Sequence, residues 1–138
     1  FPFASSHLTS KRWPYYNDLI SLIEDKYKSE YKIVVAPGPN EINDAKIINA
    51  LCILDNGRAL DISQLSTLIK SSSFVVANDT GPAHMTAHLK VKGLTLFGSH
   101  KSAFLQSIER DDFKAIQVSD LNKLSAVKVF ENLLKSLN

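Results

Sequence analysis

The sequence has few of the residue types that indicate a specialised class of protein. Its 138 residues include one cysteine, Cys52, so a framework of internal disulfides is excluded. A reduced, intracellular setting is the natural interpretation, although a secreted protein without disulfides would look the same. No apolar run approaches the roughly 18 residues of a membrane-spanning helix. The formal net charge of +2 is too small to indicate nucleic-acid binding.

The sequence also lacks an initiator methionine and the charged start of a signal peptide. Phe1-Pro2-Phe3 is typical of the end of a strand, so we expect a fragment of a longer protein. The remaining composition is ordinary for a globular domain, with 44% hydrophobic and 22% charged residues. We therefore expect residues 1–138 to form a single domain.

Helical and extended patterns alternate along the chain. The helical segments are residues 13–28, 41–51, a segment that begins at Asp61, and residues 82–89 and 121–137. The extended segments are residues 31–38, 73–77, 92–98 and 114–118, with weaker pieces at 52–54 and 58–60. This alternation predicts an α/β fold, a Rossmann-like and mainly parallel sheet with helices on both faces. Ligands of such sheets bind beyond the carboxyl ends of the strands, which here are loops 37–41, 78–84 and 98–102, joined by residues 4–13.

Asp79-Thr80-Gly81-Pro82 follows an apolar strand and opens a helix. A helix start offers backbone N–H groups and the positive end of the dipole to an anion. Gly81 lets a phosphate approach the backbone, Thr80 adds a hydroxyl, and Asp79 is interpreted as a residue that fixes the loop. A capped helix start without a ligand is the alternative. An aspartic protease is disfavoured, because such proteases are small all-β proteins that need two of these carboxylates.

Two further loops carry charged residues that suit a nucleotide. Lys11 and Arg12 lie before a helix in a hydroxyl-rich loop, where lysine binds a diphosphate as a point charge and arginine as a fork. For Arg12, a solvated basic turn is the favoured interpretation. Glu41 begins a helix after a strand, where a carboxylate accepts ribose hydroxyls or simply complements the helix dipole.

His84 and His88 are four residues apart on one helix face, a spacing that can hold a metal. No third ligand is evident, so we expect no metal site. His84 lies near enough to the helix start to reach an anion, whereas we expect His88 to pack inside. Cys52 is interpreted as a small core residue.

Three segments in this order, SKRWP, PGPNE and FVVANDTGPAHMTAHLKVKGLTLFGSH, resemble the C-terminal half of the heptosyltransferases of glycosyltransferase family nine. The resemblance extends over essentially the whole chain. Members transfer heptose from ADP-heptose to the lipopolysaccharide of Gram-negative bacteria. The resemblance implies a GT-B architecture of two Rossmann-like domains, with this chain as the donor-binding one. After LFG the family usually has Pro or Thr, and this chain has Ser99-His100, so the identity of the donor sugar stays open.

The resemblance also implies roles for individual residues on the phosphate side of the donor. Lys11 would contact the donor phosphates. Thr80 and Gly81 would bind the diphosphate through backbone N–H and hydroxyl groups. Asp79 would shape their loop, and His84 would lie at its edge.

On the nucleoside side, the resemblance places Glu41 against the ribose hydroxyls and Leu60 against the adenine. The catalytic base of the family is an acidic residue of the N-terminal half, so no catalytic residue is implied in this chain, which alone should be inactive. No cofactor or metal is implied. The acceptor would be the lipopolysaccharide core, reached through the other domain, in a cytoplasmic enzyme or one peripheral to the inner membrane.

Two alternatives stay open. One is a GT-B transferase domain that uses another nucleotide sugar, such as UDP-N-acetylglucosamine. The other is a non-catalytic nucleotide-binding or structural domain that keeps the fold without the chemistry.

Overall fold

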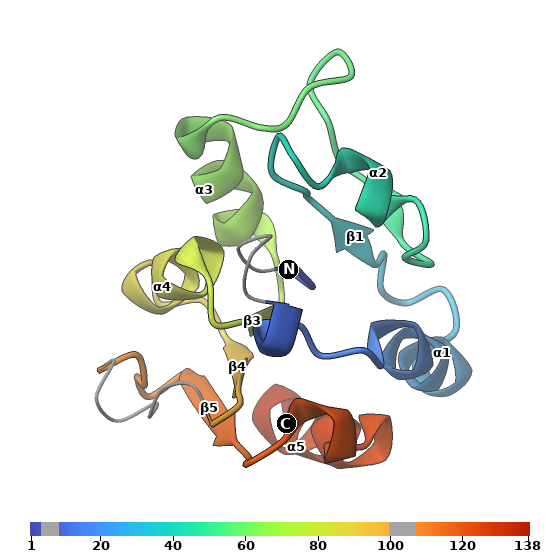
Figure 1. Ribbon diagram of the computed structural model, residues 1–138, viewed down its shortest axis with the longest axis vertical. Helices are drawn as coiled ribbons and strands as arrows, with labels where there is room; N and C mark the ends of the chain where they lie inside the picture. Colours follow the sequence, from blue (N-terminus) through green and yellow to red (C-terminus); the bar gives the residue numbers. More distant parts are fainter. Residues whose placement is uncertain (4–8, 100–106) are drawn as a thin grey trace.

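The computed structural model describes residues 1–3, 9–99 and 107–138, which alternate between helices and short strands (Figure 1). The predicted loops 4–13 and 98–102 therefore lie partly outside the described residues. The helices are η1 (Thr9–Lys11), α1 (Tyr16–Tyr27), α2 (Ile42–Ala45), α3 (Ile62–Ser71), α4 (Gly81–His88), η2 (Leu121–Lys123) and α5 (Ala126–Leu137). The strands are β1 (Val34–Val35), β2 (Leu51–Cys52), β3 (Val75–Asn78), β4 (Gly93–Phe97) and β5 (Phe113–Gln117).

All strand pairs of the described residues are parallel, apart from one isolated antiparallel bridge between Asp55 and Arg58. β3, β4 and β5 form one sheet in that order, and β1 pairs with β2 in a second. α2 lies in the connection between β1 and β2, and α4 lies in the connection between β3 and β4, as is usual for crossovers between parallel strands. The predicted α/β fold with a parallel sheet is confirmed.

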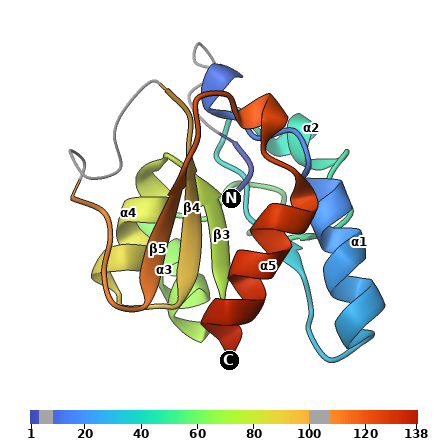
Figure 2. The same cartoon turned by 90° about the horizontal axis from the view of Figure 1, so that it is seen from below.

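Helices cover both faces of the larger sheet (Figure 2). On one face, α3 and α4 pack on the sheet through a cluster centred on Ile69, Ala83 and Phe97. On the other, α1 and α5 pack through a cluster that includes Leu19 and Leu133. β4 lies between β3 and β5, and all five of its residues are buried, as expected for a strand covered on both faces.

The segment Phe1–Phe3 lies between the two sheets (Figure 1). The Phe1 nitrogen donates to the Val76 carbonyl at 2.8 Å, and the Asn78 N–H donates to the Phe1 carbonyl at 3.1 Å. These two bonds have the pattern of a parallel strand pair, with Phe1 opposite Ala77. The Phe3 side chain packs with Val35 beside the smaller sheet, so the segment links the two sheets.

Two predicted elements are shorter than their sequence patterns. The helix predicted for residues 41–51 spans only Ile42–Ala45. Its continuation is held by the Asn17 side chain of α1, which donates to the Ile47 carbonyl and accepts from the Asn49 N–H, both at 2.8 Å. The strand predicted for residues 31–38 is reduced to Val34–Val35.

Three other boundaries also differ from the prediction. The helix predicted for residues 121–137 breaks at Ser125, whose hydroxyl caps α5 by accepting the Lys128 N–H. The helix predicted from Trp13 begins only at Tyr16. Residues 58–60 belong to no strand.

No helix of the described residues is long and apolar enough to cross a membrane.

Candidate functional site

The carboxyl end of β3 leads directly into α4 through Asp79 and Thr80. Thr80 is the N-cap residue in extended conformation, and its hydroxyl donates to the Asn78 carbonyl at 3.3 Å rather than capping the helix. Within the first turn, the N–H groups of Ala83 and His84 both bond to the Thr80 carbonyl. Pro82 has no N–H, so among the described residues Gly81 is the amide of this turn that stays available to a ligand.

The position of Gly81 is open on the side where a side chain would stand. A Cβ atom built on Gly81 would meet no heavy atom of the described residues within 4 Å, apart from its neighbours in the chain. An anion could therefore approach this amide closely, at the positive end of the α4 dipole. The phosphate-binding role of Thr80 and Gly81 stays a prediction, for which this turn has an available amide and open space.

Asp79 brings the Lys11 ammonium and the His84 imidazole to this turn. Its side chain is only 5% exposed, and its carboxylate lies 3.4 Å from the Lys11 ammonium and 3.8 Å from His84 Nε2. The Lys11 side chain is itself 13% exposed, whereas that of His84 is 40% exposed. The structure thus gathers three of the predicted site residues, Lys11, Asp79 and His84, at the N-terminus of α4.

Asn78 is a site residue that the sequence analysis did not single out. It is fully buried at the end of β3. Its Oδ1 accepts the Trp13 backbone N–H at 3.3 Å and the Tyr16 hydroxyl at 3.0 Å, and its Nδ2 donates to the Pro2 carbonyl at 2.8 Å. Burial raises the pKa of the Tyr16 hydroxyl, which keeps it a donor. Asn78 therefore fixes the loop that carries Lys11 against the turn that follows β3.

Glu41 lies on the neighbouring loop, at the N-cap position of α2. Its carboxylate accepts the Gly38 N–H at 3.3 Å, and a Cβ on Gly38 would lie 2.6 Å from the same carboxylate oxygen, so glycine leaves room for it. Burial raises the pKa of the Glu41 carboxyl, and the Gly38 N–H and the Arg12 guanidinium oppose that rise.

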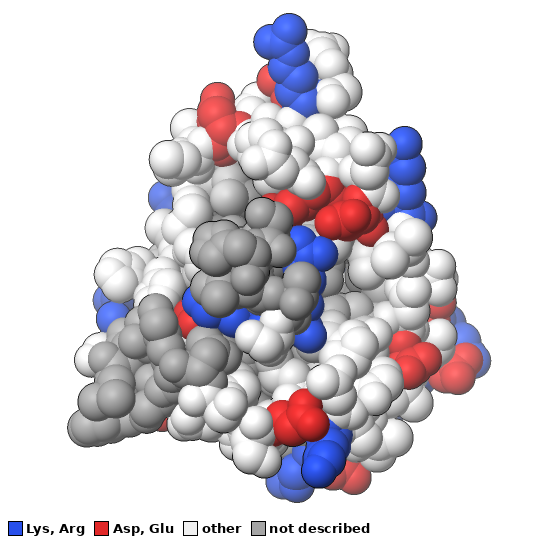
Figure 3. All heavy atoms as spheres, in the orientation of Figure 1, with Lys and Arg blue, Asp and Glu red and all other residues white. Residues whose placement is uncertain are grey.

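Arg12 connects the lysine loop to α2. Its guanidinium lies 3.3 Å from the Asp44 carboxylate and 5.4 Å from the centre of the Phe3 ring. Its side chain is 26% exposed, which differs from the solvated basic turn favoured from the sequence. Figure 3 shows basic and acidic side chains next to each other near the middle of the molecular face that it displays.

The remaining predictions concern residues farther from the Lys11–Asp79 pair. Leu60 is partly buried at the end of the loop that precedes α3, and the structure shows no contact that tests its predicted role. His88 is exposed, so the prediction that it packs inside is wrong. Cys52 is partly buried in β2. Within the described ranges, no group of three or more His, Cys, Asp or Glu side chains could hold a metal ion.

The site combines three chemical groups: the N-terminus of α4, the largely buried ammonium of Lys11 and, on the next loop, the half-buried carboxylate of Glu41. The first two groups stabilise negative charge, and a carboxylate accepts hydroxyl hydrogens. An anion joined to a hydroxyl-bearing group would satisfy both sides. A phosphorylated sugar or nucleotide is such a molecule.

The sequence matches the family "Glycosyltransferase family 9 (heptosyltransferase)" over residues 1–134. No match was found among the sequences of curated proteins. Three solved structures from Escherichia coli resemble the fold, each with 20% sequence identity. Heptosyltransferase WaaC with ADP has a TM-score of 0.71, over 91% of this chain and 40% of that one.

The other two structures are WaaC with ADP-2-deoxy-2-fluoro heptose and ADP-heptose lps heptosyltransferase II. Their TM-scores are 0.78 and 0.76, over 98% and 99% of this chain and 41% and 44% of theirs. The chain thus spans about two fifths of the length of these enzymes. The family match covers nearly all of the sequence, and the chain belongs to glycosyltransferase family 9, the heptosyltransferases.

Proposed function

We propose that the chain is the donor-binding domain of a heptosyltransferase and that it binds ADP-heptose beyond the carboxyl end of β3. The observation that carries this proposal is the Lys11–Asp79 pair at the open N-terminus of α4, in a member of this family. Related structures with ADP and with an ADP-fluoroheptose support the class of ligand.

The proposed phosphate contacts follow from the geometry of the turn. Lys11 offers a charge-assisted hydrogen bond, the Gly81 amide offers a second donor, and the Thr80 hydroxyl can turn to a third. His84 stands at the edge of the same turn, and Asp79 holds Lys11 there. These groups supply positive charge, so the proposal involves no metal ion and no cofactor.

The proposed nucleoside contacts come from the neighbouring loops. Glu41 accepts hydrogen bonds from the ribose hydroxyls, and Leu60 packs against the adenine. Because burial raises the pKa of Glu41, protonation of this carboxyl begins at a higher pH than for an exposed glutamate and removes the acceptor.

Transfer of the sugar needs two functions that the proposal assigns to different domains. The leaving diphosphate needs an electrostatic clamp, which Lys11 and the α4 start provide. The acceptor hydroxyl needs a base, which we place in a second domain together with the contacts to the lipopolysaccharide core. We therefore expect residues 1–138 to bind the donor without turning it over, as one domain of a two-domain cytoplasmic or membrane-peripheral enzyme.

A titration with ADP, UDP and ADP-heptose tests the proposal, with the amide signals of Thr80 and Gly81 followed by NMR. We expect ADP and ADP-heptose to shift both signals and UDP to compete poorly. If UDP binds more tightly than ADP, the domain serves another nucleotide sugar. If no nucleotide moves either signal, the domain keeps the fold without the binding function.

A Lys11→Gln substitution should weaken ADP binding by about ten- to one-hundredfold. A hydrogen bond to a charged group contributes about 1.5–3 kcal/mol, and about 1.4 kcal/mol corresponds to a factor of ten. Isothermal titration measures the loss, with Lys70→Gln on α3 as an exposed control that leaves affinity unchanged. An equal loss for adenosine, which has no phosphate, would show that Lys11 does not act on the phosphates.

A further inference from the structure

Lys11 and Arg12 are adjacent cations that contact different acidic partners. The Lys11 ammonium lies 3.4 Å from the Asp79 carboxylate, before the start of α4. The Arg12 guanidinium lies 3.3 Å from the carboxylate of Asp44, which belongs to α2. Trp13, the next residue, is 2% exposed and anchors this loop in the core. One short segment therefore connects the proposed phosphate side of the donor site to the helix on the proposed ribose side.

The Arg12 guanidinium also lies over an aromatic ring. Its central carbon is 5.4 Å from the centre of the Phe3 ring, within the range of a cation–π interaction. Phe3 is 8% exposed and packs with Val35 of β1 and Ala45 of α2. Because Asp44 and Ala45 belong to the same helix, the ring and the carboxylate together hold the guanidinium against α2.

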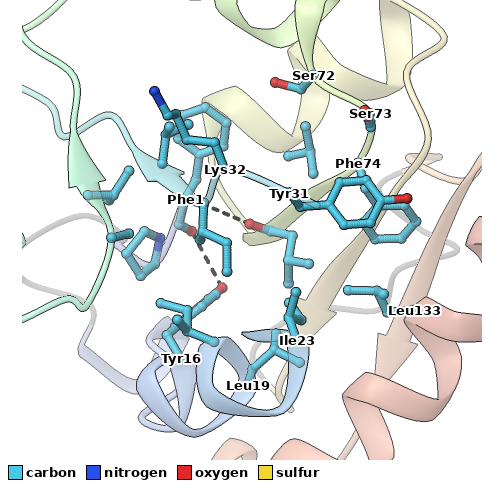
Figure 4. A pocket seen from close by; sticks show the side chains of 18 of the residues that line it. Phe1, Tyr16, Leu19, Ile23, Tyr31, Lys32, Ser72, Ser73, Phe74 and Leu133 are labelled. Atoms are coloured by element: carbon cyan, nitrogen blue, oxygen red, sulfur yellow. Dashed lines mark hydrogen bonds between the residues drawn. The ribbon is translucent and has the colours of Figure 1, made fainter. Parts of the chain in front are cut away.

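The segment Phe1–Phe3, which carries this ring, is held by hydrogen bonds at its other end. Phe1 lines an apolar cavity between β1 and β3 (Figure 4). There its nitrogen donates to the Val76 carbonyl at 2.8 Å, and its carbonyl accepts from the Tyr16 hydroxyl at 3.5 Å. The Phe3 ring is therefore part of the packed core and gives the Arg12 guanidinium a defined position.

Glu41 lies three residues before Asp44, at the N-cap position of α2. Burial raises the pKa of the Glu41 carboxyl, and the Asp44 carboxylate adds to this rise. The Gly38 N–H, the Arg12 guanidinium and the Phe1 ammonium lower the same pKa. Among the side chains that the structure describes, Arg12 is thus the cation that favours the ionised form of Glu41.

We propose that Arg12 is a positioning residue of the donor site, which ties the loop of Lys11 to α2 and keeps the Glu41 carboxylate charged for the ribose hydroxyls. This inference rests on the proposed function, which supplies the contact between Glu41 and the ribose. A charged carboxylate only accepts hydrogen bonds, whereas a protonated one uses one oxygen as a donor and accepts less well from two hydroxyls. Arg12 therefore acts on the nucleotide through Glu41 and not by a contact of its own.

The first measurement needs no ligand and follows the carboxyl carbon signal of Glu41 by NMR as the pH changes. In Arg12→Gln we expect the midpoint at a higher pH than in the wild type, because a favourable positive charge is lost. In Asp44→Asn we expect it at a lower pH, because a negative charge is lost while the asparagine oxygen can still accept from Arg12. A purely structural role of the ion pair would not move the two midpoints in opposite directions.

Two further variants make the charge effect specific. Arg12→Lys keeps the positive charge and should leave the Glu41 midpoint near that of the wild type. Lys46→Gln removes an exposed cation at the end of α2 and should also leave it unchanged. An unchanged midpoint in Arg12→Gln overturns the proposal, and so does an equal shift in Lys46→Gln.

The second measurement compares the binding of ADP and of 2′,3′-dideoxy-ADP, which lacks both ribose hydroxyls, by isothermal titration. We expect Arg12→Gln to bind ADP about two- to fivefold more weakly than the wild type, with a larger loss as the pH falls. Its affinity for dideoxy-ADP should be unchanged, because that ligand offers no hydroxyl to Glu41. Equal losses for both ligands overturn the proposal, since Arg12 would then act on the phosphates. If the wild type binds neither ligand, the proposed function fails, and the midpoints decide separately whether Arg12 sets the charge of Glu41.

Discussion

An Asn78→Ala variant is expected to lose about 3–5 kcal/mol of unfolding free energy. The substitution removes the side-chain bonds of Asn78 to three buried partners, the Trp13 N–H, the Tyr16 hydroxyl and the Pro2 carbonyl, of which the Tyr16 hydroxyl keeps only a long bond of 3.5 Å to the Phe1 carbonyl. Each such group costs about 1–3 kcal/mol when it is buried unsatisfied. Urea unfolding followed by the fluorescence of Trp13, the single tryptophan, measures the loss.

Two comparisons make this result specific. Asn122→Ala removes an exposed asparagine and should change stability by less than about 0.5 kcal/mol. Tyr16→Phe removes one partner of Asn78, so its cost should shrink in the Asn78→Ala background, a coupling that a double-mutant cycle detects. If Asn78→Ala costs less than 1 kcal/mol, Asn78 does not hold the lysine loop in place.

A Gly81→Val variant is expected to bind ADP at least one hundredfold more weakly and to keep its unfolding free energy within about 1 kcal/mol. We expect the fold to tolerate the new side chain because, in the part of the chain that the structure describes, no heavy atom beyond the chain neighbours of Gly81 lies within 4 Å of the Cβ position. We place the donor phosphate in the same open space. The valine side chain would therefore exclude the phosphate without displacing the residues around position 81. Calorimetric titration and urea unfolding measure the two quantities.

A graded series strengthens the second prediction. Gly81→Ala should give an intermediate loss of affinity, because its single methyl group fills less of the space. His88→Val puts the same β-branched residue at an exposed position of the same helix and should leave affinity unchanged. Unchanged ADP binding in Gly81→Val would mean that the phosphate binds elsewhere.

Features set by neighbouring residues were predictable from the sequence. Asp61 was predicted as the N-cap of α3, and the structure shows its side chain and that of Gln64 in a capping box three residues apart. The order of helices and strands follows from the same local patterns, and it fixes the parallel topology. The loops that carry Lys11, Glu41 and Asp79 could therefore be placed at one end of the sheet.

Features set by distant residues were not predictable. The side-chain partners of Asn78 lie 62 to 76 positions away, and nothing in the sequence near Asn78 indicates them. α2 ends early because Asn17, 30 and 32 positions before its bonded partners, holds the following backbone. Tertiary hydrogen bonds outweigh helix propensity in such short segments.

If the site binds a diphosphate as proposed, the pairing of Lys11 with Asp79 affects how quickly that ligand binds and leaves. An ammonium that is already held by a carboxylate loses little conformational entropy when a diphosphate arrives, which favours rapid capture. The diphosphate must also share that ammonium with Asp79, so it is held less tightly than by an unpaired lysine. A site of this kind would release its nucleotide product readily, and in many enzymes that release sets the turnover rate.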